Sequence, residues 1–332
     1  MRNVTLSMLG FVAAVALLAS PAMTQTSQHA FYWSQSSGFI DIGVLNGGSY
    51  AAAMAINDSG VVAGYSIATN SEVAFKWTVA GGFQILPDLG LGAEAFAINS
   101  QGEVTGFVRT PGVTSHVAKW LADGTLVDLG TLGGNGGAGL AINDQGDVAG
   151  NSYTASNSSD AFLWTSTAGF RDIATKGYAY GLNKFEIAVG QYVPQFYDQP
   201  FVWTANHGVF VIGRFGGGNA SAYAINNSGQ VVGYFDTMTN GVAHAFVWSP
   251  SRHHTRDLGT LGAGKVSVAN AINSLGQIAG FSSTSDNSAT HAVVWDGKGG
   301  IVDLGTLSGG INSYAYGINV QGAVVGSSQV LQ

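Results

Sequence analysis

The residues with the most chemical potential lie in one irregular stretch, from Tyr192 to Pro200. This stretch holds three aromatic residues, two prolines and one carboxylate. Aromatic side chains with a few polar groups are typical of carbohydrate and peptide sites. Neighbouring connections bring one tyrosine and one arginine within reach. We therefore expect a ligand site formed by Tyr178, Tyr192, Phe196, Tyr197, Asp198 and Arg214. A loop that packs on its own scaffold is the alternative.

The same stretch also permits a catalytic hypothesis, a polysaccharide lyase or hydrolase. Tyr192 or Tyr197 would transfer a proton, and Arg214 would steady a substrate carboxylate. No isolated acid–base constellation supports this hypothesis, so the sequence favours a non-catalytic protein and we assign no catalytic residue.

The histidines and the recurring aspartates have structural explanations. His29, His116, His244 and His291 occupy one position of a repeat, as do the aspartates of an Asp-Leu-Gly motif. Such residues are expected to tie turns rather than to react. His207, His253 and His254 lie outside this pattern and are expected on the opposite face of the molecule. Adjacent residues in an extended segment point in opposite directions, so we predict no metal site.

One glycine pattern resembles a dinucleotide-binding loop, Gly134-x-Gly136-x-x-Gly139. That function requires a helix after the loop, whereas Ala141-Ile142-Asn143 continues as a strand. We expect no cofactor.

The organisation of the chain is set by three motifs that each recur seven times. The first is small-x-small-Ile-Asn followed by a turn and Val-x-Gly, with successive Asn residues 42, 44, 40, 43, 47 and 46 residues apart. The second ends in Trp and accounts for all seven tryptophans, and the third is Asp-Leu-Gly or a variant. The variants of the third motif begin at Asp41, Asp88, Asp128, Asp172, Val211, Asp257 and Asp303.

Each repeat of about 44 residues predicts four short strands. Ala-x-Ala-Ile-Asn alternates as a pleated strand does, and Asn57 to Gly60 is a hairpin turn whose Asn can bond its own backbone. Four strands at this period are typical of propeller blades. We predict an all-β chain that forms a seven-bladed β-propeller of four-stranded antiparallel blades. A β-solenoid is the alternative, although its parallel coils fit poorly with hairpin turns.

The order of strands resembles that of WD-repeat propellers, which places the small-residue strand innermost and the Asp-Leu-Gly strand outermost. The chain then begins with two outer strands and ends with two inner ones. We therefore expect the last blade to be closed by N-terminal outer strands and C-terminal inner strands, which removes exposed sheet edges.

The motifs together resemble a known family. His29 to Trp33, Asp128-Leu-Gly-Thr-Leu-Gly-Gly and Ala53-x-Ala-Ile-Asn are similar to the HAF family of bacterial extracellular repeat proteins. The resemblance covers residue 29 to the C-terminus and implies an exported protein, without implying any activity or catalytic residues. The fourth repeat departs from the pattern at Glu186, Gln199 and Val211.

The first 22 residues read as a secretory signal peptide, with Arg2, an apolar run from Val4 to Ala19 and a cleavage site after Ala22. Residues 23–332 are expected to form a single propeller, secreted or periplasmic. An uncleaved membrane anchor is the alternative, but the apolar run is short for a span.

Composition limits the partners. The chain has 46% hydrophobic and 9% charged residues, a net charge of −7 and no cysteine. An acidic chain is a poor partner for nucleic acid, and the absence of cysteine excludes disulfides and thiolate chemistry. We expect a monomer, without a membrane span after cleavage, that binds an extracellular glycan, peptide or surface protein through one loop face.

Overall fold

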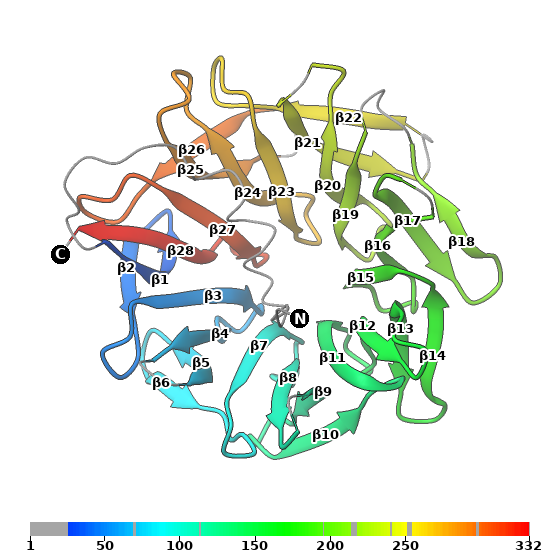
Figure 1. Cartoon of the computed structure of the whole chain (residues 1–332). Coiled ribbons are helices and arrows are strands. Elements are labelled where there is room, and N and C mark those ends of the chain that lie inside the picture. Colours follow the sequence, from blue (N-terminus) through cyan, green and yellow to red (C-terminus); the bar gives the residue numbers. More distant parts are fainter. Residues whose placement is uncertain are drawn as a thin grey trace.

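The computed structural model describes residues 26–68, 71–112, 114–194, 196–213, 218–239, 241–250, 254–296 and 299–331. The expected signal peptide, residues 1–22, therefore lies outside the described residues. Within them the regular structure consists of 28 strands and no helix. Figure 1 shows the strands arranged around a common centre, with short sheets that run outward from it. The prediction of an all-β, propeller-like chain is confirmed.

The strands pair antiparallel in consecutive sets of four. Within each set the four strands lie at increasing distance from the centre (Figure 1). The innermost strands are β3 (Tyr50–Ile56), β7 (Ala93–Ile98), β11 (Gly133–Ile142), β15 (Gly177–Leu182), β19 (Ala220–Ile225), β23 (Ser267–Ile272) and β27 (Ser313–Ile318). The second strands are β4 (Val62–Ile67), β8 (Val104–Thr110), β12 (Val148–Thr154), β16 (Ala188–Tyr192), β20 (Val231–Asp236), β24 (Ile278–Ser283) and β28 (Val324–Leu331).

The two outer strands of each set complete it. The third strands are β5 (Glu72–Thr78), β9 (Thr114–Trp120), β13 (Ser159–Thr165), β17 (Gln199–Thr204), β21 (Ala243–Ser249), β25 (Thr290–Trp295) and β1 (Thr26–Ser34). The outermost strands are β6 (Gly82–Ile85), β10 (Leu126–Gly130), β14 (Gly169–Ala174), β18 (Gly208–Val211), β22 (His254–Gly259), β26 (Ile301–Gly305) and β2 (Gly38–Gly43).

The two ends of the chain share one set of strands. β1 pairs with β28 over eight residue pairs, from Thr26↔Leu331 to Trp33↔Val324. β2 pairs with β1, and β27 pairs with β28. Figure 1 shows the blue N-terminal strands beside the red C-terminal ones. The order β27-β28-β1-β2 is the order expected for the set that contains both chain ends.

The hydrogen-bonded ladders do not form one continuous sheet. They make two eight-stranded sheets and three four-stranded sheets. Each large sheet arises from one parallel contact between neighbouring sets, Gln28↔Tyr50 between β1 and β3, or Gly136↔Ser115 between β9 and β11. Neighbouring sets also pack through apolar side chains such as Val104, Ala95 and Ala63, which belong to one buried cluster.

The innermost strand is not a simple pleat, because each one carries a β-bulge inside the Ala-x-Ala motif. In β3 the register shifts between Ala53 and Ala55, so that Met54 has no partner on β4. A bulge of this kind re-aims the extra side chain. The bulged residues are Met54, Phe96, Leu140, Tyr180, Tyr223, Asn270 and Tyr316.

The bulged side chains meet although they come from different sets. Phe96 and Leu140 are buried in one cluster, and Met54, Tyr180 and Tyr316 pack against it. These five residues belong to five innermost strands, so one cluster joins side chains from five sets.

The glycine of Val-x-Gly is explained by the same bulge. A Cβ atom added to Gly64 would lie 2.2 Å from the carbonyl oxygen of Ala52, and one added to Gly233 would lie 1.9 Å from that of Ser221. The bulged strand approaches its neighbour so closely that only hydrogen fits there.

The asparagines at the ends of the innermost strands are buried and form a cycle of hydrogen bonds. Asn57 Oδ1 accepts from the backbone N–H groups of Ser59 and Val61, as the sequence predicted. Its Nδ2 also donates to the carbonyl oxygen of Asn99 in the next repeat, at 3.0 Å. The same donor bond continues from Asn99 to Asn143, Asn183, Asn226, Asn273 and Asn319. Asn319 Nδ2 donates back to Asn57 O at 3.2 Å.

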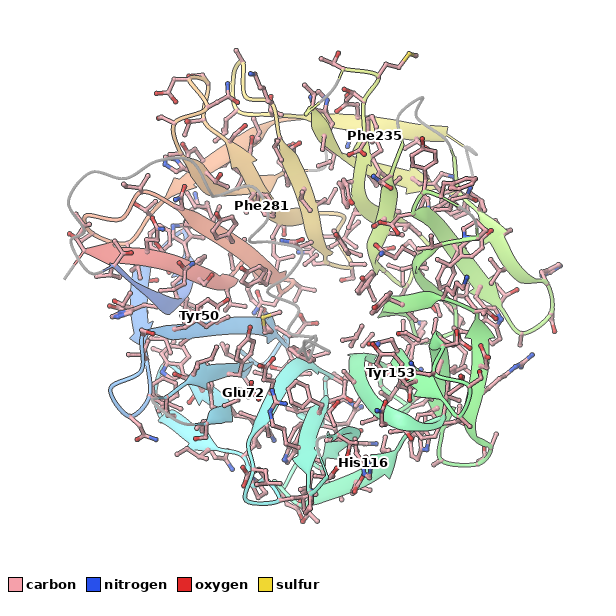
Figure 2. The ribbon with its side chains drawn as sticks, viewed as in Figure 1. Tyr50, Glu72, His116, Tyr153, Phe235 and Phe281 are labelled. Carbon is pink, nitrogen blue, oxygen red and sulfur yellow. The ribbon has the colours of Figure 1, made fainter. Side chains whose placement is uncertain are left out.

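The recurring histidines and aspartates hydrogen-bond to each other. His29 Nδ1 lies 3.0 Å from Asp41, and the corresponding distances for His116–Asp128, His244–Asp257 and His291–Asp303 are 2.8–3.0 Å. His116 lies near β9 and β10, toward the rim (Figure 2). The aspartates also accept backbone N–H groups, for example that of Gly130.

One assignment within this motif is wrong. Asp88 is not equivalent to the other aspartates, because Ile85 is the residue that pairs with Phe75. Asp88 lies three residues later, after β6, and accepts the N–H groups of Gly90 and Gly92. The motif letters match, but the outermost strand of that repeat ends earlier.

Candidate functional site

The irregular connection between β16 and β17 is fastened to the connection between β18 and β19. The N–H of Asp198 donates to Asn219 Oδ1 at 3.1 Å, and the N–H of Ala220 donates to the carbonyl oxygen of Asp198 at 3.1 Å. Both connections therefore lie on one face of the ring, which we call the loop face. One residue of the expected site, Arg214, lies outside the described residues, as does Gln195 of the first connection.

The predicted residues do not all lie together. Tyr178 pairs with Gln191 across β15 and β16, whereas Tyr192 pairs with Gly177. Tyr178 and Tyr192 therefore project from opposite faces of their sheet. The ring of Tyr192 packs into an apolar cluster and lies edge-on to Phe201, with centroids 6.2 Å apart. Tyr192 therefore packs on the scaffold, as expected under the alternative hypothesis for this loop.

Tyr178 instead belongs to a row of tyrosines that connects two neighbouring sets of strands. It stacks on Tyr180 with ring centroids 5.8 Å apart. Tyr180 lies edge-on to Tyr223 of β19 at 5.2 Å, and Tyr223 stacks on Tyr234 of β20 at 5.9 Å. All four residues are half-buried, and the phenol groups of Tyr180 and Tyr223 are buried. They form a continuous aromatic surface over β15, β19 and β20.

Two carboxylates lie beside this surface. Asn219 donates from both its backbone N–H and its side-chain Nδ2 to Asp236 Oδ2, at 3.1 Å each, while its Oδ1 holds Asp198. Burial and, second, the nearby charge of Asp236 raise the pKa of Asp198. Among the described residues, the ion pairs include neither carboxylate. We call Tyr178, Tyr180, Tyr223, Tyr234, Asp198 and Asp236 the tyrosine–aspartate cluster.

Hydrogen bonds fix the base of the cluster. Ser221 Oγ donates to Gln191 Oε1, and Ser221 also hydrogen-bonds to the hydroxyl groups of Tyr223 and Tyr234. Burial raises the pKa of Tyr234 to about 12 and raises those of Tyr180 and Tyr223 as well. These phenols are therefore neutral hydrogen-bonding groups near neutral pH and poor general bases.

The exposed part of the connection covers this cluster at one edge. Phe196 is 86% exposed and Tyr197 is 58% exposed. A Cβ atom added to Gly218 would lie 3.2 Å from Tyr197 Cδ1 and 3.8 Å from Asp236 Oδ2. The Tyr197 ring thus lies beside the backbone of Gly218 and near Asp236, and more than half of the residue stays exposed.

Sequence reasoning found Tyr178, Tyr197 and Asp198 but missed Tyr180, Tyr223, Tyr234 and Asp236. Tyr180 and Tyr223 are bulged residues of their strands, and Tyr234 occupies the variable position of Val-x-Gly-x. The available signal was the variation between repeats. The bulged position holds Tyr or Phe in some repeats and Met, Leu or Asn in others, and the position after Val-x-Gly holds Tyr or Phe in some and Asn, Gln or Ser in others.

His207 does not join the cluster. His207 lies in the connection between β17 and β18, where Thr204 Oγ1 is 3.3 Å from its Nδ1. This connection is at the other end of β17 from Asp198, as expected. His253 lies outside the described residues. Within the described part of the chain, no group of three or more His, Asp or Glu side chains could hold a metal ion.

The architecture and this site define a propeller-like scaffold with a polar and aromatic surface on its loop face. No protein-family model and no curated protein sequence matches the chain. Solved structures share the fold. The β-propeller domain of the Trilobed protease from Pyrococcus furiosus, which has an open velcro topology, gives a TM-score of 0.56 at 10% identity, covering 81% of this chain and 86% of that one.

Two further structures extend the comparison. An oligogalacturonate lyase in complex with manganese gives a TM-score of 0.58 at 9% identity, covering 93% of this chain and 91% of that one. TolB from Acinetobacter baumannii gives 0.50 at 11% identity, covering 82% and 80%. At these identities the likeness shows the fold alone. Within the described residues, no helix is long and apolar enough to cross a membrane.

Proposed function

We propose that the chain is an exported, non-catalytic seven-bladed β-propeller, similar to HAF repeat proteins, that binds a glycan at the tyrosine–aspartate cluster. The first 22 residues would be its signal peptide. The blade count is supported by the sets of four antiparallel strands and by the seven-membered cycle of asparagine hydrogen bonds, which returns from Asn319 to Asn57. Closure is supported by the pairing of β1 with β28.

The binding role depends on one observation. Two carboxylates, Asp198 and Asp236, stand beside a row of four half-buried tyrosines at positions where the repeats differ from one another. Carboxylate oxygens accept hydrogen bonds from sugar hydroxyls, and aromatic faces pack against the apolar faces of sugar rings. Neutral glycans fit this surface better than acidic ones, because the carboxylates repel a second negative charge.

The lyase alternative finds less support in this geometry. It needs Tyr192 or Tyr197 to move a proton and Arg214 to hold a uronate carboxylate. Tyr192 packs into the scaffold, and two aspartates beside Tyr197 disfavour an acidic substrate. Incubation with acidic polysaccharides should release no unsaturated product detectable by absorbance, and release of such product would replace the binding proposal with a lyase.

A glycan array tests the proposal with two matched variants. Tyr197→Ala removes a 58% exposed ring from the cluster, and Phe185→Ala removes a 61% exposed ring from the turn after β15, on the opposite face. Loss of one stacking ring should weaken glycan binding about tenfold, which corresponds to about 1.4 kcal/mol. Phe185→Ala should bind as the wild type does.

Three results would contradict the proposal. They are the absence of any bound glycan, equal binding by both variants, and binding of peptides by the same face with no preference for sugars. An Asp198→Asn/Asp236→Asn variant separates the carboxylates from the rings, since it keeps side-chain size while it removes both charges.

A further inference from the structure

The repeats provide an internal comparison of equivalent positions. One variable position lies two residues before the bulged residue of each innermost strand. In β3, β11 and β15 the residue at this position packs in the same apolar cluster as the bulged residue. The occupants of this position are Ala52, Glu94, Ala138, Tyr178, Ser221, Val268 and Tyr314. Glu94 on β7 is the only ionisable carboxyl among them, and nothing in the repeat pattern requires it.

Glu94 is an unusual residue for its location. Its side chain is 1% exposed, and among the described residues its Oε2 is the one buried side-chain polar atom without a hydrogen-bond partner. Burial, followed by the charge of Glu72, raises the pKa of Glu94 to about 8 against the opposing effect of Arg109. An unsatisfied buried acceptor is costly, so native proteins rarely keep one without a use.

The nearby cation does not compensate Glu94 because it is already engaged. Arg109 Nε and Nη2 each donate to the carboxylate of Glu72 at 2.6 Å. This bidentate pair joins β8 to β5. The structure thus places two carboxyl groups and one guanidinium together, which leaves a deficit of one positive charge when Glu94 is ionised.

Phenol groups complete the surroundings. Tyr50 of β3 and Tyr65 of β4 lie close enough to interact electrostatically with Glu94, and their ring centroids are 5.9 Å apart. Tyr50 also exchanges hydrogen bonds with Tyr65, Tyr316 and Ser327. Figure 2 shows Tyr50 and Glu72 in the same sector of the ring, near β3 and β7. Glu94 therefore lies within electrostatic range of phenol groups on β3 and β4.

We propose that Glu94, with Glu72 and the hydroxyl groups of Tyr50 and Tyr65 around it, forms a binding site for one small monovalent cation. Carboxylate and phenol oxygens suit a hard cation. Within the described residues no third carboxylate is present for a divalent ion. The site shares no residue with the tyrosine–aspartate cluster and does not depend on the glycan proposal.

Binding exchanges a proton for the cation. The O–H bond of the Glu94 carboxyl breaks, its proton passes to solvent, and the carboxylate oxygen coordinates the incoming ion, so that the net charge of the site does not change. Without a cation, Glu94 remains protonated in the folded protein while it is ionised in the unfolded chain above its ordinary pKa. The unfolded state then binds fewer protons, so stability falls as pH rises from about 4.5 to about 8.

The test compares the wild type with Glu94→Gln in equilibrium unfolding at pH 5–8, in NaCl, KCl, NH4Cl or choline chloride at equal ionic strength. In choline chloride the unfolding constant of the wild type should rise about tenfold per pH unit relative to the variant. In the salt whose cation fits, this rise should shrink and the wild type should gain stability with cation concentration, about 100-fold at 100 times Kd. The three small cations identify which one the site prefers.

Glu186→Gln makes the same chemical change at an exposed residue and should follow the wild type in every salt. A wild-type pH dependence that is identical in all four salts overturns the proposal. So does a salt-specific gain that persists in Glu94→Gln. A fall in stability that is equal in both proteins would show that Glu94 is not the titrating group and would also overturn it.

Discussion

The asparagine cycle makes a quantitative prediction about stability. Asn226 is 5% exposed. Its Oδ1 accepts the N–H groups of Ser228 and Gln230 at 3.0 Å each, and its Nδ2 donates to Gln230 Oε1 at 2.9 Å and to Asn273 O at 3.1 Å. With a net value of about 1 kcal/mol for each hydrogen bond, Asn226→Ala should lower the free energy of unfolding by about 3–4 kcal/mol.

Guanidinium chloride unfolding followed by tryptophan fluorescence measures this loss as a lower midpoint at unchanged slope. Ser228→Ala is the matched control, because Ser228 is exposed and contributes only its backbone to the turn. It should change stability by less than about 0.5 kcal/mol. A loss below about 1 kcal/mol for Asn226→Ala would refute the reasoning, since it would mean that water replaces all of these bonds.

The cycle also distinguishes a closed ring from an open one. Asn57→Asp and Asn319→Asp each keep the accepted bonds but lose the donor bond to the next repeat, which for Asn319 leads back to Asn57. In a closed ring the two variants should lose similar amounts, about 1–2 kcal/mol. If Asn319→Asp cost nothing while Asn57→Asp did, the closing contact would be absent in solution.

Three further predictions concern the scaffold. Deletion of residues 26–45 removes β1 and β2 and exposes the edge of β28, so the product should aggregate in size-exclusion chromatography, whereas a stable monomer would contradict the strand order. Gly233→Ala should lower the free energy of unfolding by several kcal/mol in denaturant, because its Cβ would lie 1.9 Å from a carbonyl oxygen. Gly38→Ala is the control: the site has open space but a positive φ, so the loss should be about 1 kcal/mol. Equal losses would refute the close-approach argument. Asp160→Asn should flatten the fall in stability expected above about pH 4, because burial and then Asp160 raise the pKa of Asp172. Since Asp172 is exposed, the change should stay below about 1 kcal/mol, and unchanged urea midpoints at pH 4 and pH 7 would show that the two carboxyls do not interact.

Much of the scaffold could be predicted because each repeat restates the same physical constraints. The turn asparagine, the hairpin and the Trp strand occur seven times, so a chance match in one repeat does not mislead. The order of strands within a repeat can then be inferred from the order of the motifs. The bulge could not be predicted, because Ala-x-Ala has the same alternation in a flat strand as in a bulged one. The misplaced Asp88 shows the same limit: a motif fixes residue order, whereas strand length decides which residue enters the ladder.

The candidate site was only partly predictable for a related reason. The search of the sequence favoured an irregular loop, and Tyr197 and Asp198 do lie at the edge of the cluster. Tyr180 and Tyr223, however, sit inside regular motifs, where they look like ordinary strand residues. Whether Tyr192 faced the site or the scaffold depended on the pairing of Gly177 with Tyr192, a register that the sequence leaves open.

In a repeat whose recurring residues are each required by the fold, variation at the remaining positions indicates a role other than folding. The Asn, the Gly and the small residues beside the bulge are each fixed by a hydrogen bond or a close approach, so they cannot respond to a ligand without loss of the fold. The bulged residue has no ladder partner and the residue two before it faces the same neighbourhood, so both can change at little structural cost. Selection for binding can therefore act there first. Tyr180, Tyr223 and Glu94 all occupy such positions, which is why we place both proposed sites at variable positions of the innermost strands rather than at the regular histidine–aspartate pairs.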